Sequence, residues 1–317
     1  MLFCMDFFIL TILYKRVLPR MSTVQQVSNG KSKVLVATAS GLLTILLWSS
    51  LAVTTTSLPN MPRFQLLWFG FGEAFIIGSI ILTLTGRVRE MAQPFAPWFT
   101  AFCGIFFFHL FYFVGLDFAP PAKVTLLSYL WPTMLVVCIA LLSKKQFHIA
   151  YLLGALMGLI GTIFLMPADQ GSVLTSGNLF GYLLGVLCAI VWTIYSIVNR
   201  KYISVPTGMM IGVCGGISLV SMMIHFAFEL TVMPNSWQEM LIILYVGCGP
   251  MGIAFLAWDY ATKNANLSLM GSLSYLAPLL STLWLVIAGR APATMGLLIA
   301  VILIVGGAVV ATYPLKK

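Results

Sequence analysis

The sequence predicts an all-α integral membrane protein whose ten transmembrane helices form two inverted repeats of five. Three observations support this fold class. Of the 317 residues, 60% are hydrophobic and only 8% are charged, whereas a soluble domain carries roughly 25% charged residues. Ten apolar runs follow one another, and their lengths are close to the ~20 residues that cross a bilayer. A five-residue motif that ends in a mid-span proline occurs once in each half of the chain.

The apolar runs divide the chain into its predicted domains. Only short linkers separate them, so no soluble domain fits between them. We expect an N-terminal cytoplasmic segment at residues 1–33, a first five-helix repeat at 34–166 and a second at 178–313. Residues 2–14 are too few to span a bilayer and precede their basic residues, unlike a secretory signal, so Met21 is an alternative start of translation. The predicted spans cover residues 34–57, 64–84, 97–116, 122–142, 148–166, 178–198, 209–229, 239–261, 267–288 and 294–313.

The fourth and ninth spans carry the proline motif. Ser128-Tyr129-Leu130-Trp131-Pro132 returns 146 positions later as Ser274-Tyr275-Leu276-Ala277-Pro278. Proline removes a backbone donor in mid-membrane, so the carbonyl that it leaves unpaired needs a partner from a neighbouring helix, a hydroxyl group or cavity water. Interrupted spans of this kind are typical of transporter sites near the bilayer midplane.

Other positions repeat at nearly the same spacing. Trp48 recurs as Trp192, and Cys103-Gly104 recurs as Cys248-Gly249. Because five spans is an odd number, the second copy must enter the membrane from the opposite side. The pattern therefore predicts an inverted repeat with a binding site between its halves.

Basic residues predict the orientation of the chain. All but three of the 17 Lys and Arg residues fall in segments on the side of the N-terminus, the exceptions being Arg63, Lys123 and Arg290. By the positive-inside rule, both termini are predicted to be cytoplasmic. The net charge of +9 is scattered over short loops, whereas nucleic-acid binding requires basic residues gathered on one face, so no nucleic-acid partner is predicted.

The motifs present favour a transporter over other membrane proteins. An intramembrane enzyme would need clustered acid–base or metal-binding residues, yet the sequence has no HExxH, paired-aspartate or GxSxG motif. It also has no GxxxxGK[ST] motif, and the cysteines lack metal-ligand spacing, so neither a nucleotide-hydrolysing partner, a cofactor nor a metal is predicted. A receptor or assembly subunit would need neither a polar cavity nor an inverted repeat. We expect alternating-access transport of a small molecule across a lipid bilayer.

These features together resemble a known family. Ten spans in two halves, a tryptophan in the first span of each half and Tyr-Leu-Trp-Pro in the fourth are similar to the EamA-type drug/metabolite transporter superfamily, and within it to the bacterial aromatic amino acid exporters. The resemblance implies a multi-pass protein of the bacterial inner membrane with a central cavity. Tyr275, the counterpart of Tyr129, is expected in that cavity too. The family's cavity-lining positions carry over to His109, Tyr112, Tyr129, Trp131 and Pro278.

Glu73 departs from the pattern of the aromatic amino acid exporters. A mid-span carboxylate is costly to bury, and it usually serves a partner or a cationic substrate. Other members of the superfamily exchange S-adenosylmethionine for S-adenosylhomocysteine, and the aromatic pocket with one acid favours that substrate. Export of aromatic amino acids is the alternative. The structural interpretation of Glu73 is a pair with His109 or His225, or a neutral acid.

The remaining candidates concern motion. Tyr129 and Trp131 lie about 200° apart on an unbroken helix, so Pro132 must distort the turn if both side chains face one cavity. Pro132, Gly249 and Pro250 are candidate hinges, although Gly247 to Gly252 also suits close packing. Asp259 and Trp258 are candidates for an inner gate, and a tryptophan beside an acid is equally typical of a membrane interface.

Overall fold

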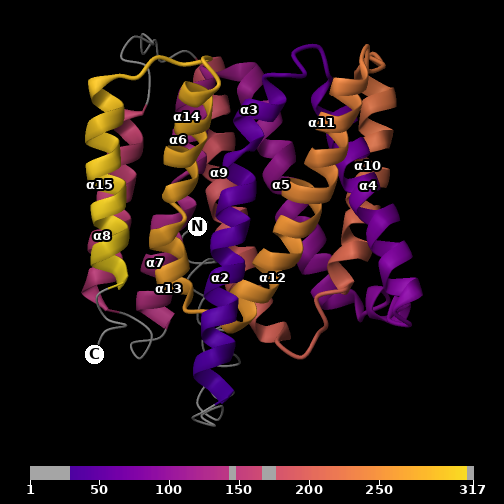
Figure 1. Ribbon diagram of the computed structural model, residues 1–317, viewed down its shortest axis with the longest axis horizontal. Helices are drawn as coiled ribbons and strands as arrows, with labels where there is room; N and C mark the ends of the chain where they lie inside the picture. Colours follow the sequence, from indigo (N-terminus) through magenta and orange to yellow (C-terminus); the bar gives the residue numbers. More distant parts are fainter. Residues whose placement is uncertain (1–28, 143–147, 166–175, 313–317) are drawn as a thin grey trace.

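The computed structural model describes residues 29–142, 148–165 and 176–312, and every regular element in these ranges is a helix. The helices stand side by side in one bundle, with their connections at its two ends (Figure 1). Most of the predicted N-terminal segment, including Met21, lies outside the described residues. The first half contains α2 (Asn29–Ser49), α3 (Leu51–Thr55), α4 (Arg63–Leu84), η2 (Val88–Met91), α5 (Phe95–Phe118), α6 (Pro121–Ser128), α7 (Trp131–Leu142) and α8 (Ile149–Phe164). The second half contains α9 (Ser176–Asn199), η4 (Arg200–Tyr202), α10 (Met209–Phe228), α11 (Trp237–Cys248), η5 (Gly249–Ile253), α12 (Ala254–Asn264), α13 (Leu267–Leu273), α14 (Leu276–Ile287) and α15 (Met295–Thr312).

Nine helical segments of the described chain are long and apolar enough to cross a membrane. They correspond to nine of the ten predicted spans. The predicted fifth span is α8, an apolar helix of 16 residues that is shorter than the others. The all-helical membrane class is therefore confirmed, while the count of ten spans stays a prediction.

Helix breaks occur where the sequence places mid-span prolines. In the fourth span α6 ends at Ser128 and α7 begins at Trp131, directly before Pro132. In the eighth span Pro250 lies in η5, a π-helical segment in which the N–H of Ala254 donates to the carbonyl of Gly249, five residues back. Proline supplies no N–H and its ring crowds the carbonyl four residues earlier, so the α-helical ladder cannot continue through it. The predicted breaks are thus present, and their role as hinges stays a prediction.

The main helix pairs each join one half of the chain to the other. α4 packs against α10, α8 against α15, α7 against α13, α2 against α12, and α5 against α9. The last two pairs are equivalent, because each joins the first span of one half to the third span of the other. A matched hydrogen bond holds each of them: Thr44 Oγ1 donates to the carbonyl of Ala254 (3.0 Å), and Cys188 Sγ donates to that of Phe108 (3.4 Å). The two halves are therefore interlocked rather than merely adjacent.

Equivalent spans run in opposite directions, as an inverted repeat requires. In the α4–α10 pair, Gly72 meets Ser218 while Gly78 meets Ile211, so the two helices run antiparallel. α2 begins and α15 ends at the same end of the bundle, the lower end in Figure 1. That this end faces the cytoplasm stays a prediction.

The α8–α15 pair shows how small residues set helix distance. A Cβ added to Gly154 would stand 2.5 Å from the carbonyl oxygen of Gly307, and one added to Gly307 would stand 2.7 Å from that of Gly154. Only glycine permits such an approach of two backbones, which is the usual means of packing helices in a membrane.

Candidate functional site

Five aromatic side chains meet where the two halves of the bundle join. Trp48 lies 5.3 Å from Trp192, 5.5 Å from Phe255 and 5.5 Å from Trp258, measured between ring centroids. Trp131 lies 5.5 Å from Trp258 and 6.1 Å from Trp192. We call these five residues the ring cluster. Its members come from α2, α7, α9 and α12, so both repeats contribute to it.

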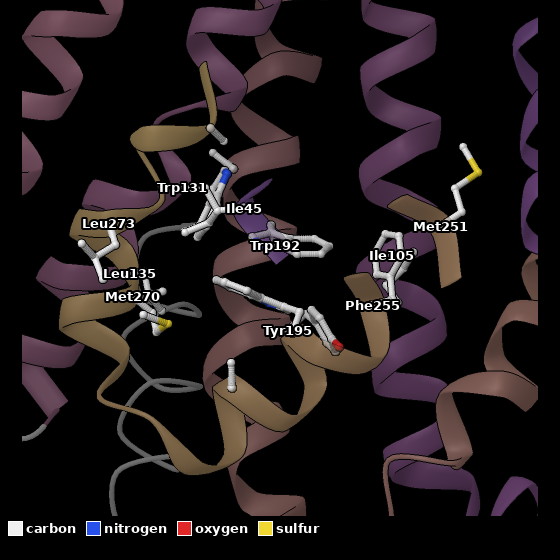
Figure 2. Packing of buried hydrophobic residues seen from close by; sticks show 14 of the residues in the cluster. Ile45, Ile105, Trp131, Leu135, Trp192, Tyr195, Met251, Phe255, Met270 and Leu273 are labelled. Atoms are coloured by element: carbon white, nitrogen blue, oxygen red, sulfur yellow. The ribbon is translucent and has the colours of Figure 1, made fainter. Parts of the chain in front are cut away.

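The ring cluster is shielded from solvent. Trp258, Trp192, Phe255 and Trp131 are at most 7% exposed, and Trp48 is half-buried. Figure 2 shows Trp131, Trp192 and Phe255 approaching one another from separate helices. Mixed edge-to-face and tilted rings stabilise each other by about 0.5–1.5 kcal/mol per pair beyond burial. They also present ring faces and edges on which a planar or cationic group can stack.

His109 joins the ring cluster from α5. Its ring lies 6.1 Å from that of Phe255 and 5.6 Å from that of Phe71. Its Nδ1 is 2.8 Å from the carbonyl oxygen of Ile105, and because a carbonyl only accepts, Nδ1 carries the proton in this bond. In the neutral ring Nε2 is then an acceptor. The structure thus brings His109, Trp131 and Trp258 together, as three of the predicted site residues.

Tyrosines hold the break in the fourth span. The hydroxyl of Tyr275 lies 2.6 Å from Thr133 Oγ1 and donates to the carbonyl of Tyr129 at 3.0 Å. Tyr129 is the C-cap residue that directly follows α6. A side chain from the other repeat therefore satisfies a carbonyl at the break. Tyr275 is fully buried and Pro278 is buried nearby in α14. Tyr112, on α5, makes a separate hydroxyl contact with Thr125 at 2.9 Å.

Hydrogen-bond donors within the ring cluster are unequally used. Trp48 Nε1 donates to the carbonyl of Pro250 in η5 at 3.2 Å. Its repeat counterpart, Trp192, has a buried Nε1 with no hydrogen-bond partner in the described chain. Trp192 packs edge-on against Phe108 of α5. The hydroxyl of Tyr195, one turn away, is likewise buried without a partner among the described residues.

Glu73 lies on a different face of α4 from the residue that reaches the cluster. Phe71 of α4 packs on Phe255, whereas the Oε2 atom of Glu73 abuts Gly247 of α11. Neither histidine suggested as a structural partner pairs with it, because His109 bonds to Ile105 and His225 bonds to Glu229. The structure therefore does not place Glu73 among the rings. Its assignment to substrate binding stays a prediction.

Asp259 and Trp258 are both buried inside the bundle. Trp258 is fully buried in the ring cluster, and its Nε1 donates to Ser196 Oγ at 3.3 Å. Asp259 is fully buried too, and its carboxylate accepts from Lys263 Nζ at 2.8 Å and from Asn199 Nδ2 at 2.9 Å. Lys263 is itself only 2% exposed, so the ion pair lies inside the bundle. The role of Asp259 and Trp258 in an inner gate stays a prediction.

Sequence reasoning missed several residues of this site. Trp48 and Trp192 mark the repeat in the sequence but were not predicted as site residues, although their equal positions in the two halves were the signal that could have found them. Phe71 and Phe255 gave no signal, since phenylalanine is common throughout these spans. In the described part of the chain, no three His, Cys, Asp or Glu residues come together to hold a metal ion.

Comparison with known proteins decides the family. The model of the EamA-like transporter family matches residues 35–166 and again residues 179–313. The chain belongs to the EamA-like transporter family. An EamA protein is a membrane transporter, and the two matches establish its two-repeat architecture. They fall within a few residues of the predicted repeat boundaries.

Individual EamA relatives agree with this assignment. The chain is 41% identical over 279 residues to the aromatic amino acid exporter YddG of Ancylobacter novellus, covering 87% of this chain and 96% of that protein. It is 23% identical over 194 residues to the YddG of Escherichia coli, covering 58% of this chain and 64% of the relative. A solved crystal structure at 40% identity superposes with a TM-score of 0.83 over 90% of this chain and 98% of the other.

Proposed function

We propose that this EamA transporter exports aromatic amino acids across the bacterial inner membrane. The observation that carries the proposal is the ring cluster, in which four tryptophans from both repeats meet at the centre of the bundle. An aromatic side chain can stack on such rings with each stacked pair worth about 0.5–1.5 kcal/mol beyond burial. The name of the 41% identical relative points to the same substrate class.

Polar groups beside the rings suit the amino-acid end of this substrate. The Trp192 indole N–H and the Tyr195 hydroxyl are unpartnered in the described chain, and His109 offers an acceptor. Buried polar groups without partners are costly, so a ligand that satisfies them gains affinity. A mostly apolar site with a few convergent polar groups is typical of small-molecule binding.

Exchange of S-adenosylmethionine, the first of the two substrates expected from the sequence, loses its basis here. That expectation rested on Glu73 acting as a counter-ion within the aromatic pocket. Glu73 instead lies against Gly247, while Phe71 reaches the rings. None of the named YddG relatives is described as a carrier of S-adenosylmethionine. The aromatic amino acid alternative needs no buried acid.

Alternating access would proceed by motion of the interlocked halves. The inverted repeat supports two related conformations that open the site to either side of the membrane in turn. The breaks at Pro132 and Pro250 are where the helices bend most readily, because the α-helical ladder is already interrupted there. We place both termini in the cytoplasm on the distribution of basic residues.

Counterflow in proteoliposomes tests the proposal. Vesicles loaded with unlabelled phenylalanine should take up labelled phenylalanine faster than empty vesicles, and excess tyrosine or tryptophan should compete while leucine should not. Labelled S-adenosylmethionine in vesicles loaded with S-adenosylhomocysteine is the matched comparison. Uptake of S-adenosylmethionine with no phenylalanine counterflow would overturn the proposal. Accumulation of phenylalanine in the medium of producing cells tests the direction.

A further inference from the structure

Glu73 occupies the middle of its span and has no ionic partner. It is the eleventh residue of the 22 in α4. None of the ion pairs in the described chain includes it. Its Oε2 atom is buried without a hydrogen-bond partner in the same residues. A buried carboxylate without a counter-ion or a donor is expensive, and a carboxyl group in this position is carried more cheaply as the neutral acid.

Gly247 of α11 packs closely against the Oε2 atom of Glu73. A Cβ added to Gly247 would meet Glu73 Oε2, would stand 2.8 Å from Glu73 Cβ and would stand 3.0 Å from the carbonyl oxygen of Gly70. A cation in a protein needs several oxygen ligands around it. Among the described residues no group of His, Cys, Asp or Glu side chains gathers at Glu73 to supply such ligands, whereas a proton needs none.

Few titratable groups face Glu73. On α11 the Cys248 thiol is the group that interacts with it electrostatically. On α10, His225 and Glu229 are paired with each other at the far end of α4, where Glu229 also accepts from the N–H of Gln65. In η2, Glu90 is paired with Arg87. The charge state of Glu73 is thus set by its own surroundings rather than by a fixed neighbouring charge.

The broken segment η5 connects Glu73 to the ring cluster. On the Glu73 side, Gly252 of η5 packs against Ala74 of α4. A Cβ added to Gly252 would stand 2.7 Å from the carbonyl oxygen of Gly247. On the other side, the carbonyl of Pro250 accepts from Trp48, and Phe255 follows η5 directly. π-helical turns concentrate at functional sites and bend readily. η5 is therefore a single element whose position bears on both the acid and the rings.

We propose that Glu73 is a proton-binding site that couples transport to a pH gradient, an inference that rests on the proposed transport function. In the conformation described here the carboxyl group is protonated. When η5 and α11 move away from α4 in the alternate conformation, water reaches the acid, its O–H bond breaks and the proton passes to that water as the carboxylate is hydrated. Substrate binds in place of the proton on that side of the membrane, the carrier returns with the substrate, and Glu73 takes up a proton from the opposite side as the substrate leaves. One proton is moved in each cycle.

Gradient-driven transport by the full chain in proteoliposomes tests this. With labelled phenylalanine as the probe, an imposed gradient of one pH unit should change accumulation by about tenfold for one proton per substrate. Glu73→Gln, which copies the neutral acid, should lose this response while phenylalanine counterflow persists. Glu239→Gln, at the start of α11 where the carboxylate accepts from the N–H of Asn235, is the matched control and should keep both.

A second measurement tests the proton site even if Glu73→Gln transports phenylalanine poorly. Phenylalanine added to the detergent-solubilised protein in weak buffer should shift the signal of a pH dye, and Glu73→Gln should abolish that shift. Counterflow without a pH response in the unmodified protein, or accumulation driven by a sodium gradient instead, would overturn the proton site and leave the proposed function standing. Absence of counterflow would overturn the proposed function and this inference with it.

Discussion

The hydroxyl of Tyr275 donates to the backbone carbonyl of Tyr129 at 3.0 Å, and the two tyrosines occupy equivalent positions in the two repeats. A side chain of one proline motif thus stabilises the helix break made by the other. No reciprocal bond from the Tyr129 hydroxyl to Tyr275 is present in the described chain, so the repeat symmetry is broken at its own signature motif.

Removing this hydroxyl should loosen the break. Tyr275→Phe leaves the carbonyl of Tyr129 and the hydroxyl of Thr133 without their shared partner, which should lower the free energy of unfolding by about 1–3 kcal/mol. Thermal unfolding in detergent measures the change. Tyr245→Phe is the control, because its hydroxyl bonds to Ser50 alone and at an exposed site. An equal effect of the two variants would contradict this account.

Truncating a cluster tryptophan should weaken substrate binding. Trp131→Ala removes a ring that is 7% exposed and contacts both Trp192 and Trp258. Loss of about 1.4 kcal/mol of stacking raises the KM for phenylalanine by about tenfold. Trp131→Phe should recover part of the loss, and Trp237→Ala, which truncates a 66% exposed ring on α11, should change the KM little. Concentration-dependent counterflow provides these values.

A side chain at position 247 should disrupt the contact between α4 and α11. Gly247→Ala places a methyl group against Glu73, and overpacking of this kind costs about 1–3 kcal/mol. Gly249→Ala is matched, since its nearest neighbour would be Leu47 Cδ2 at an ordinary 3.4 Å. Thermal unfolding in detergent should separate the two variants. Comparable stability of both would show that α11 shifts freely.

The buried Asp259–Lys263 pair should matter more than the exposed Arg63–Asp117 pair. Asp259→Ala leaves Lys263 charged and 2% exposed, which should cost about 3–5 kcal/mol of folding stability. Asp117→Ala breaks a pair whose side chains are 41% and 61% exposed, and should cost about 0–1 kcal/mol. Denaturation midpoints in detergent compare them. The double variant of Asp259 and Lys263 to apolar residues should regain much of the loss.

Much of the fold can be predicted from the sequence. The apolar runs predicted the helices, the odd number of spans per repeat predicted the inverted repeat, and Pro132 and Pro250 indicated the helix breaks. Trp258 shows the limit of such reasoning. A tryptophan beside an acid does not reveal that Trp258 is fully buried in the ring cluster or that Asp259 pairs with Lys263 inside the bundle.

The candidate site was less predictable for a physical reason. A span that is apolar on all sides does not reveal which of its faces meets which helix. The residue pattern of α4 therefore does not distinguish Phe71, which faces the rings, from Glu73, which faces Gly247. The unpartnered N–H of Trp192 is likewise a property of the packed bundle, because the local sequence does not show which acceptors lie beside it.

The π-helical segment η5 also affects how a ligand is oriented. Before it, Gly249 is 145 positions from its counterpart Gly104, whereas after it Ala254 is 146 positions from Phe108. The π-helical turn absorbs the additional residue, so Ala254 and Phe108 still accept equivalent bonds from Thr44 and Cys188, while η5 itself has no equivalent in α5. A site with true twofold symmetry would accept a molecule equally well in either of two opposite poses. The carbonyl of Pro250 in η5 satisfies the N–H of Trp48, while that of Trp192 has no partner among the described residues, and this difference removes that degeneracy, as recognition of a molecule with two chemically different ends requires.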